Sequence, residues 1–176
     1  IRRSTLQMNQ LIEDLLDYSR LERTQLRIQP IKIKDLIKSV FSIFKSDLAE
    51  GNFKLDLNIE DIEIVADSKG LTIALRNILE NAIKFTKSQQ EPLIQINVEE
   101  KDLVWIISVK DNGIGFNMQY HEKIFEIFQR LQRAEDFPGT GIGLAMVSKA
   151  MQRMKGRAMA ESIPGKGSTF SLEIPK

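Results

Sequence analysis

The stretch Asp111-Asn112-Gly113-Ile114-Gly115 decides how this chain is interpreted, because two other segments frame it in a telling order. Before it lies Asn77-Ile78-Leu79-Glu80-Asn81-Ala82-Ile83-Lys84-Phe85, on a predicted helix. After it comes Gly139-Thr140-Gly141-Ile142-Gly143-Leu144, which opens another predicted helix. A carboxylate can accept a hydrogen bond from an exocyclic amine such as that of adenine, and glycine turns let backbone amides approach phosphates. Together the three segments predict a nucleotide pocket.

The composition narrows the class of protein. The chain has 176 residues, 42% of them hydrophobic, which is enough for one cored domain and a smaller appendage. Its 25 Lys and Arg balance 24 Asp and Glu, a net charge of +1 that argues against a DNA- or RNA-binding surface. The absence of Cys excludes disulfides and thiolate metal sites. No apolar stretch is long enough for a membrane segment and no signal peptide is visible, so we expect a cytoplasmic protein.

Residues 1–29 are predicted to form a unit of their own, a helix over about 1–27. Its apolar residues recur at steps of three and four and make a stripe wide enough to bury more than one side: Met8, Leu11, Ile12, Leu15, Leu16 and Tyr18. A lone helix of this length is marginal in water, so we expect it to pack against a second helix or a second copy of the chain. Because the chain begins inside this helix without a Met, we expect it to be a fragment of a longer protein.

Residues 30–176 are predicted to form an α/β domain, a two-layer sandwich with a mixed sheet. Asp35 and Asp67 are expected to cap two of its helices, and Gly51 and Gly156 to end two of them. The predicted helices span residues 35–49, 68–87 and 141–155. The predicted strands span residues 31–33, 53–59, 62–66, 93–99, 103–110, 157–162 and 168–174. The connection 112–140, with one short helical piece over 122–129, is long enough to be a functional lid.

Each motif has a plainer interpretation when it is taken alone. Asn77, Asn81 and Lys84 share one helix face and suit a magnesium-bound polyphosphate, yet polar helix faces are common. Asp111 to Gly115 is also an ordinary turn signal. The segment from Gly139 is not a dinucleotide fingerprint, because no strand enters it directly and Leu144 stands at the sixth position. It is not a P-loop either, since no Lys-Ser or Lys-Thr follows.

In combination, these motifs resemble the ATP-binding catalytic domain of sensor histidine kinases, a Bergerat-type fold of the gyrase, chaperone, histidine kinase and mismatch-repair ATPase superfamily. The resemblance covers about residues 30–176. In chain order, its N box, first glycine box, F box, second glycine box and final glycine-rich segment match residues 77–85, 111–115, 125–128, 139–144 and 165–170. The amino-acid sequences of residues 128–131 and 137–144 are most similar to those of kinases linked to phytochrome-like or PAS-type sensors.

The resemblance implies ATP and Mg²⁺ as ligands and assigns roles to individual residues. Asn81 would coordinate Mg²⁺, Phe85 would lie against the adenine and Asp111 would read its amine. Asn77, Lys84 and Arg130 would act at the metal and phosphate end and are the implied catalytic residues. The residues implied to contact nucleotide are Asn77, Asn81, Lys84, Phe85, Asp111, Gly113, Ile114, Gly115, Phe128, Arg130, Gly139, Thr140, Gly141, Ile142, Gly143, Leu144 and Thr169.

The resemblance also implies partners. Residues 1–29 would be the second helix of a dimerisation hairpin, giving a homodimer, and residues 116–138 would be the mobile ATP lid. The phosphate would pass from ATP to a His upstream of residue 1, and then to an Asp of a response-regulator receiver domain. His121 is the only His in the chain and is expected to be an ordinary lid residue.

One position separates kinases from hydrolytic relatives. By resemblance, hydrolytic members carry a Glu four residues before the metal Asn, where this chain has Asn77, which cannot take a proton from water. Glu80 is expected to point about a hundred degrees away from Asn81. Two alternatives stay open at this point: a hydrolysing ATPase and a non-catalytic dimerisation module. Lys149, Arg153 and Lys155 are expected to form a solvated helix face, although a basic face beside the pocket could also serve a partner.

Overall fold

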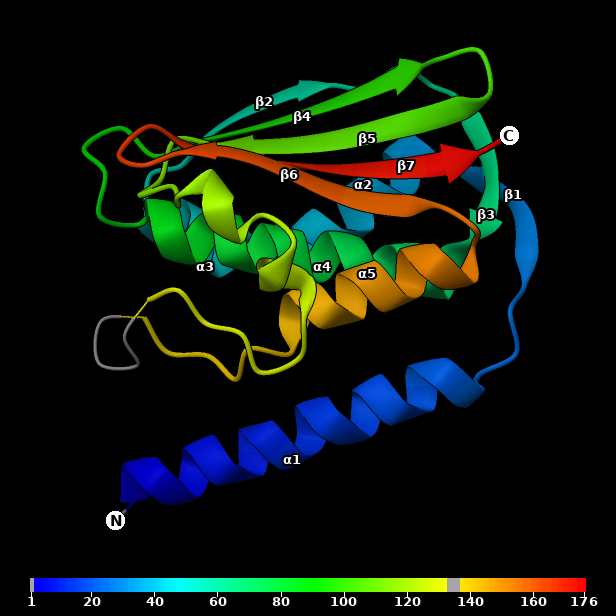
Figure 1. The fold of residues 1–176 in the computed structure, drawn as a ribbon. Helices are drawn as coiled ribbons and strands as arrows, with labels where there is room; N and C mark the ends of the chain where they lie inside the picture. The colour runs from blue at the N-terminus through cyan, green and yellow to red at the C-terminus, as the bar shows by residue number, and fades with distance from the viewer. Residues whose placement is uncertain (1, 133–136) are drawn as a thin grey trace.

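The computed structural model describes residues 2–132 and 137–176. They form a helix, α1 (Arg2–Arg23), that runs alongside a two-layer α/β body (Figure 1). Residue 1, assigned from the sequence to the first helix, and residues 133–136, assigned to the lid, lie outside the described residues. The predicted two-layer fold with a preceding helix is confirmed.

One layer is a mixed sheet of five strands in the order β2-β4-β5-β7-β6. Strand β2 (Lys54–Asn58) is parallel to β4 (Leu93–Glu100), and all other neighbouring pairs are antiparallel. The remaining strands are β5 (Val104–Asp111), β6 (Arg157–Ile163) and β7 (Gly167–Pro175). The predicted β4–β5 hairpin pairs Ile94 with Asp111, which fixes the carboxylate at the end of the sheet where the long connection begins.

The second layer consists of helices packed on one face of the sheet (Figure 1). Helix α4 (Ser68–Thr86) lies beside α5 (Gly143–Arg153), and α2 (Ile33–Ile43) and the short α3 (Lys45–Glu50) complete the layer. The core joins the apolar stripe of α4, including Leu71, Leu75 and Ile78, to inward-facing residues of alternate strand positions. Asp67 caps α4 as predicted, because its carboxylate accepts a hydrogen bond from the amide of Gly70 at 3.1 Å.

Several element boundaries differ from the sequence prediction. The helix predicted over 35–49 begins at Ile33, whose fully buried side chain belongs to the core, and breaks at Phe44 into α2 and α3. The strand before it is β1 (Ile28–Lys32), which pairs with β3 (Glu63–Asp67) in a separate two-stranded sheet. Asp35 therefore lies within the first turn of α2 instead of capping it.

Within its described residues, 112–132 and 137–142, the connection between β5 and α5 holds two 3₁₀ turns, Met118–Tyr120 and Lys123–Phe125, in place of the predicted helical piece over 122–129. The backbone leaves the helical region at Phe128, which has a φ of +66°, because its N–H donates to the carbonyl of Gly141 at 2.9 Å. A long-range backbone hydrogen bond thus replaces the local one that a helix would need.

Helix α1 packs its C-terminal half against α5. The prediction that Lys149 and Arg153 form a solvated face was wrong for these two residues. Lys149 pairs with Glu22 of α1 at 2.8 Å, and the Arg153 guanidinium donates to the carbonyls of Leu21 and Thr24. These carbonyls lie at the end of α1, where helical hydrogen bonding runs out.

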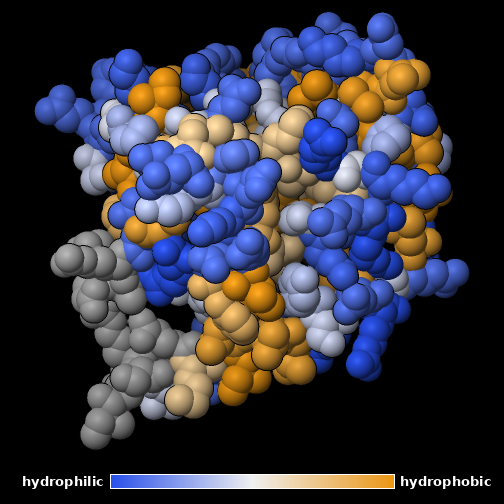
Figure 2. All heavy atoms as spheres, in the orientation of Figure 1, coloured by the Kyte–Doolittle hydropathy of each residue, from blue (hydrophilic) through white to orange (hydrophobic). Residues whose placement is uncertain are grey.

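The other side of α1 carries its apolar stripe, which is exposed on this single chain: Met8, Leu11, Ile12, Leu15 and Leu16. Figure 2 shows the resulting hydrophobic patch at the lower edge of the molecule. No helix within residues 2–132 and 137–176 combines the length and apolar character that crossing a bilayer requires.

Candidate nucleotide site

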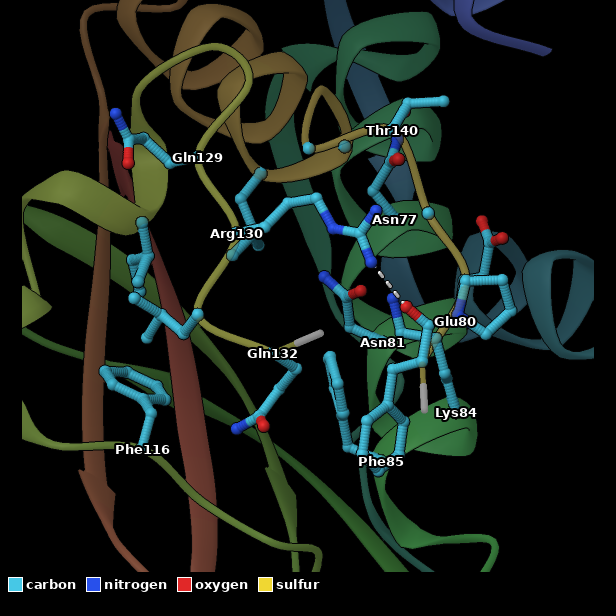
Figure 3. A pocket seen from close by; sticks show the side chains of 18 of the residues that line it. Asn77, Glu80, Asn81, Lys84, Phe85, Phe116, Gln129, Arg130, Gln132 and Thr140 are labelled. Atoms are coloured by element: carbon cyan, nitrogen blue, oxygen red, sulfur yellow. Dashed lines mark hydrogen bonds between the residues drawn. The ribbon is translucent and has the colours of Figure 1, made fainter. Parts of the chain in front are cut away.

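The three segments singled out in the sequence meet around one cavity of about 350 Å³. Helix α4, the end of β5 and the turn before α5 line it, together with described residues of the connection within 114–132 and 137–141 (Figure 3). The predicted site residues that line it are Asn77, Asn81, Lys84, Phe85, Asp111, Ile114, Gly115, Arg130, Gly139, Thr140, Gly141, Gly143 and Leu144.

Asp111 is buried at one end of the cavity, with 4% of its surface exposed. Its Oδ1 accepts hydrogen bonds from the amides of Gly113 at 2.8 Å and Ser168 at 3.3 Å, and Oδ2 has no donor among the described residues. Burial raises the pKa of Asp111 to about 6, although the two amides oppose the shift. A desolvated carboxylate oxygen is thus left to accept a hydrogen bond from a ligand.

The turn after Asp111 is fixed by contacts with other parts of the chain. The amide of Ile114 donates to the carbonyl of Phe85 at 3.2 Å, which ties this turn to the end of α4. Gly115 has a φ of +62°, and a Cβ there would collide with the carbonyl of Ile163. Glycine is required at this position for both reasons. These contacts therefore fix the backbone of the turn beside Asp111.

The polar face of α4 supplies the carboxamides. Asn81 is partly exposed to the cavity and makes no side-chain hydrogen bond to any described residue. The Asn77 side chain is more committed: its Nδ2 donates to the carbonyl of Ile73 at 2.8 Å. Its Oδ1 lies only 2.8 Å from where a Cβ on Gly143 would stand. Asn81 therefore has the uncommitted carboxamide of this face, whereas Asn77 is held between α4 and α5.

Lys84 extends the same row toward the glycine-rich turn. Its ammonium lies 4.4 Å from the centroid of the Phe85 ring and close to Gly139. Burial lowers the pKa of Lys84, while the nearby charge of Glu80 raises it and that of Arg130 lowers it. A partly desolvated cation of this kind interacts more strongly with a phosphate than an exposed one would.

Arg130 and Thr140 approach the cavity from the connection that covers it (Figure 3). The Arg130 guanidinium donates to the carbonyl of Phe137 at 2.7 Å, and the Phe137 ring packs on Phe85 with centroids 5.1 Å apart. Gly141 has a φ of +76°, and a Cβ there would lie 2.8 Å from the backbone of Phe128. Helix α5 begins just beyond, so its N-terminal amides and positive dipole end lie at this side of the cavity.

Four predicted contact residues do not line the cavity. Thr169 lies on the sheet face away from the helices, because alternate residues of a strand point to opposite sides; its neighbours Ser168 and Phe170 line the cavity instead. Phe128 is 54% exposed and acts only through its backbone bond to Gly141. Gly113 and Ile142 are buried behind the cavity wall.

Other lining residues were missed from the sequence. Phe116 and Phe137 add aromatic surface to the cavity. The alternation of residues along β7 could have predicted that Ser168 and Phe170 face the cavity. Glu80, which was expected to point about a hundred degrees from Asn81 around the helix, also lines the cavity. Gln10, Asp14 and Asp17 of α1 also line it, and nothing in their spacing to the other motifs indicated this.

The donor set fits a magnesium ion only with the help of a ligand. Among residues 2–132 and 137–176, no group of three or more His, Asp or Glu could hold a metal. The Asn81 carboxamide could supply one oxygen and a polyphosphate the others, which is the usual way Mg²⁺ is bound beside nucleotides. His121 is exposed outside the cavity and bonds to the carbonyl of Met118 in its own turn.

A family model described as histidine kinase-, DNA gyrase B- and HSP90-like ATPase matches residues 66–176, which include every cavity-forming segment except α1. The chain belongs to this family. Among the similar proteins are the phytochrome-like protein Cph1 of Synechocystis, 32% identical over 96% of this chain, and the sensor histidine kinase WalK of Bacillus subtilis, 33% identical over 97%. The resemblance to sensor histidine kinases, including phytochrome-like ones, is confirmed.

The matches cover a part of each relative. The chain spans 22% of the length of Cph1 and 29% of that of WalK. Among solved structures, full-length ShkA in complex with AMPPNP superimposes with a TM-score of 0.79 at 27% identity, over 94% of this chain and 35% of ShkA. This ATPase-family chain therefore corresponds to one segment of larger proteins.

Proposed function

We propose that this chain is the ATP-binding catalytic part of a sensor histidine kinase, which binds Mg²⁺-ATP and delivers the γ-phosphoryl group to a His. One observation carries the proposal. A buried carboxylate with a free oxygen, Asp111, and a row of carboxamide and ammonium groups, Asn81 and Lys84, lie on the walls of one cavity. ShkA, the similar protein solved with an ATP analogue, supports the choice of nucleotide.

Two groups of residues would bind the two ends of the nucleotide, one the adenine and the other the charged phosphates. Asp111 Oδ2 would accept a hydrogen bond from the adenine amine, and Phe85 offers an aromatic face to the ring. Lys84, Arg130 and the N-terminal amides of α5 would hold the phosphates and offset their charge. Asn81 would hold Mg²⁺, which neutralises phosphate charge when bound. Phosphoryl transfer depends mainly on such positioning and charge stabilisation, so the acceptor only has to be brought to the exposed γ-phosphate.

The proposed assignment as a sensor histidine kinase also implies partners for this chain. The exposed apolar stripe of α1 fits a helical bundle with a second copy of the chain, and Met8 and Ile12 are 62% and 51% exposed in its absence. We place the phosphoacceptor His on the other helix of that hairpin and the final acceptor on a response-regulator receiver domain. This rests on the kinship with sensor histidine kinases such as WalK.

The full-length protein incubated with γ-labelled ATP tests the proposal. We expect label on the protein that survives alkali and is lost in mild acid, as a phosphohistidine is. Release of the label only as inorganic phosphate, with none on protein, would refute the kinase assignment.

A hydrolysing ATPase is the second candidate, because Glu80 lies at the rim of the cavity and carries a base that Asn77 lacks. Glu80 is, however, exposed and one helical turn from Lys84, whose pKa its charge raises. We therefore expect Glu80→Gln to change steady-state phosphate release by less than about twofold, since the charge of an exposed side chain contributes little. A fall of about 100-fold or more would identify Glu80 as a base for water and favour the ATPase.

The raised pKa of Asp111 predicts a pH dependence of nucleotide binding. The ionised carboxylate accepts the amine hydrogen bond, and its protonated form loses this ability at Oδ2, so affinity for ADP should fall as the pH drops through about 6. Because the folded pKa lies above the ordinary value of 3.8, the contribution of this group to stability runs the other way. It is full below about pH 4 and is lost as the pH rises through about 6. Calorimetric titrations and thermal melts between about pH 4 and 8 measure both trends. An affinity for ADP that rises toward acid pH would contradict the role of Asp111 as acceptor for the adenine amine.

A further inference from the structure

Helix α1 forms part of the nucleotide cavity as well as the predicted dimer face. Gln10, Asp14 and Asp17 follow one another by four and three residues, so they share one side of the helix, and all three line the cavity. Leu21, one further turn along the same side, is buried with 4% of its surface exposed. The apolar stripe of α1 points elsewhere, so dimerisation would leave this acidic side directed at the cavity.

The contact between α1 and the body is held by specific bonds. Lys149 pairs with Glu22, and Arg153 binds the last carbonyls of α1, as described above. The burial of Leu21 adds an apolar contact. These contacts lie at one end of α1 and hold its acidic residues at the mouth of the cavity.

Asp14 makes the contact that matters for a nucleotide. Its Oδ2 accepts a hydrogen bond from the Thr140 hydroxyl at 2.5 Å. Thr140 belongs to the glycine-rich turn next to Lys84, where the proposed function places the phosphates. A hydroxyl has a single hydrogen to donate, so Thr140 cannot serve Asp14 and a phosphate oxygen at once.

Electrostatic repulsion, like the competition for the Thr140 hydroxyl, disfavours binding of phosphates beside docked α1. Arg76, Lys84 and Arg130 line the same cavity, and the carboxylates of Asp14 and Asp17 offset part of their positive field. Each added phosphate brings further negative charge toward the two carboxylates. The repulsion therefore grows from AMP to ADP to ATP.

We propose that Asp14 is a nucleotide-discriminating residue, through which docked α1 lowers the affinity for ATP more than that for ADP or AMP. The inference rests on the proposed function, because it takes Thr140 and Lys84 to be the phosphate end of the site. By reciprocity, ATP binding weakens the docking of α1 on the body. ATP thus favours the separation of α1 from the body.

Calorimetry with AMP, Mg²⁺-ADP and Mg²⁺-ATP on the unaltered chain, Asp14→Asn, Asp14→Glu and the control Asp56→Asn tests the proposal. Asp56 is exposed on the edge strand β2, so its replacement removes the same charge far from the cavity. We expect Asp14→Asn to tighten Mg²⁺-ATP binding about three- to tenfold, ADP less and AMP by under about 1.5-fold. Asp14→Glu and Asp56→Asn should keep the unaltered ratio of ATP to ADP affinity. The part of the difference that comes from charge repulsion should vanish near about 1 M salt, where charges are screened within about 3 Å.

An unchanged ATP-to-ADP ratio in Asp14→Asn would overturn the inference, and weaker ATP binding would do so by showing that Asp14 assists the nucleotide. Failure of the unaltered chain to bind any nucleotide would overturn the proposed function as well, so the two failures are distinguishable.

A distance measurement provides the second readout. The chain has no Cys, so spin labels can be placed on Glu13→Cys of α1 and Gln152→Cys of α5 alone, both at exposed positions. Saturating Mg²⁺-ATP should lengthen the distance between the labels, and ADP should do so less. An unchanged distance with bound ATP would contradict release of α1.

Discussion

Asp111→Asn is expected to abolish nucleotide binding while making the nucleotide-free protein more stable at neutral pH. The two backbone amides of Gly113 and Ser168 require an oxygen at Oδ1, so the asparagine must direct its NH₂ group toward the cavity. A donor then faces the adenine amine, which is itself a donor. We expect the dissociation constant of Mg²⁺-ADP to rise about 100-fold or more, because a buried pair of donors is left without an acceptor.

The gain in stability has a separate cause. Burial raises the pKa of Asp111, so the ionised form is less favourable in the folded protein than in the unfolded chain at pH 7. The neutral asparagine removes that cost, and the melting temperature should rise by about 2–4 °C, equivalent to roughly 1 kcal/mol for a domain of this size. Calorimetry and a thermal melt on the same sample measure both effects. A dissociation constant within about threefold of the unaltered protein would show that Asp111 does not read the base.

Asn81→Ala is expected to eliminate phosphoryl transfer while sparing recognition of the base. Asn81 is the one carboxamide on the cavity face of α4 without a side-chain hydrogen bond to a described residue, so its loss leaves no substitute ligand at this point of the helix. We expect phosphorylation of the full-length protein to fall about 100- to 1,000-fold, the range seen when a charge-stabilising group is removed. Affinity for AMP without metal should stay within about twofold of the original, because the Asp111 end is unaltered.

Asn97→Ala is the matched control for this change, since Asn97 lies on β4 and faces away from the helices, where it bonds to Asn58 and Glu99. It should leave both readouts unaltered. Normal phosphorylation by Asn81→Ala at saturating Mg²⁺-ATP would remove Asn81 from the metal site and with it the assignment of the polar row on α4.

The strongest local signals gave the elements of the fold. Asp67 capped α4, and the alternating residues of β4 and β5 predicted their hairpin, because each signal depends on neighbours in the sequence. The break at Phe44 and the unwinding at Phe128 were not predictable in this way. The unwinding accompanies the hydrogen bond from the Phe128 amide to the carbonyl of Gly141, thirteen residues further along the chain. Patterns among neighbouring residues do not indicate hydrogen bonds of this range.

The lining of the cavity follows the predicted motifs where a motif contributes its own residues and departs from them where another element contributes. Asp111, Asn81 and Lys84 line the cavity, whereas Thr169 does not, because it lies on the opposite face of β7 from Ser168 and Phe170. Asp14 is more than a hundred residues from Thr140, and only the packing of α1 on α5 brings the two together. Tertiary contacts between such distant residues determine which further side chains line the cavity, and local sequence patterns do not predict them.

A structure of the chain with Mg²⁺ and a non-hydrolysable ATP analogue tests the central claim most directly. The account predicts the adenine amine within hydrogen-bond distance of Asp111 Oδ2, the phosphates between Lys84 and the turn at Gly139 to Gly143, and the metal on Asn81. An analogue bound elsewhere, or in the cavity with its phosphates at Asp111, would contradict it.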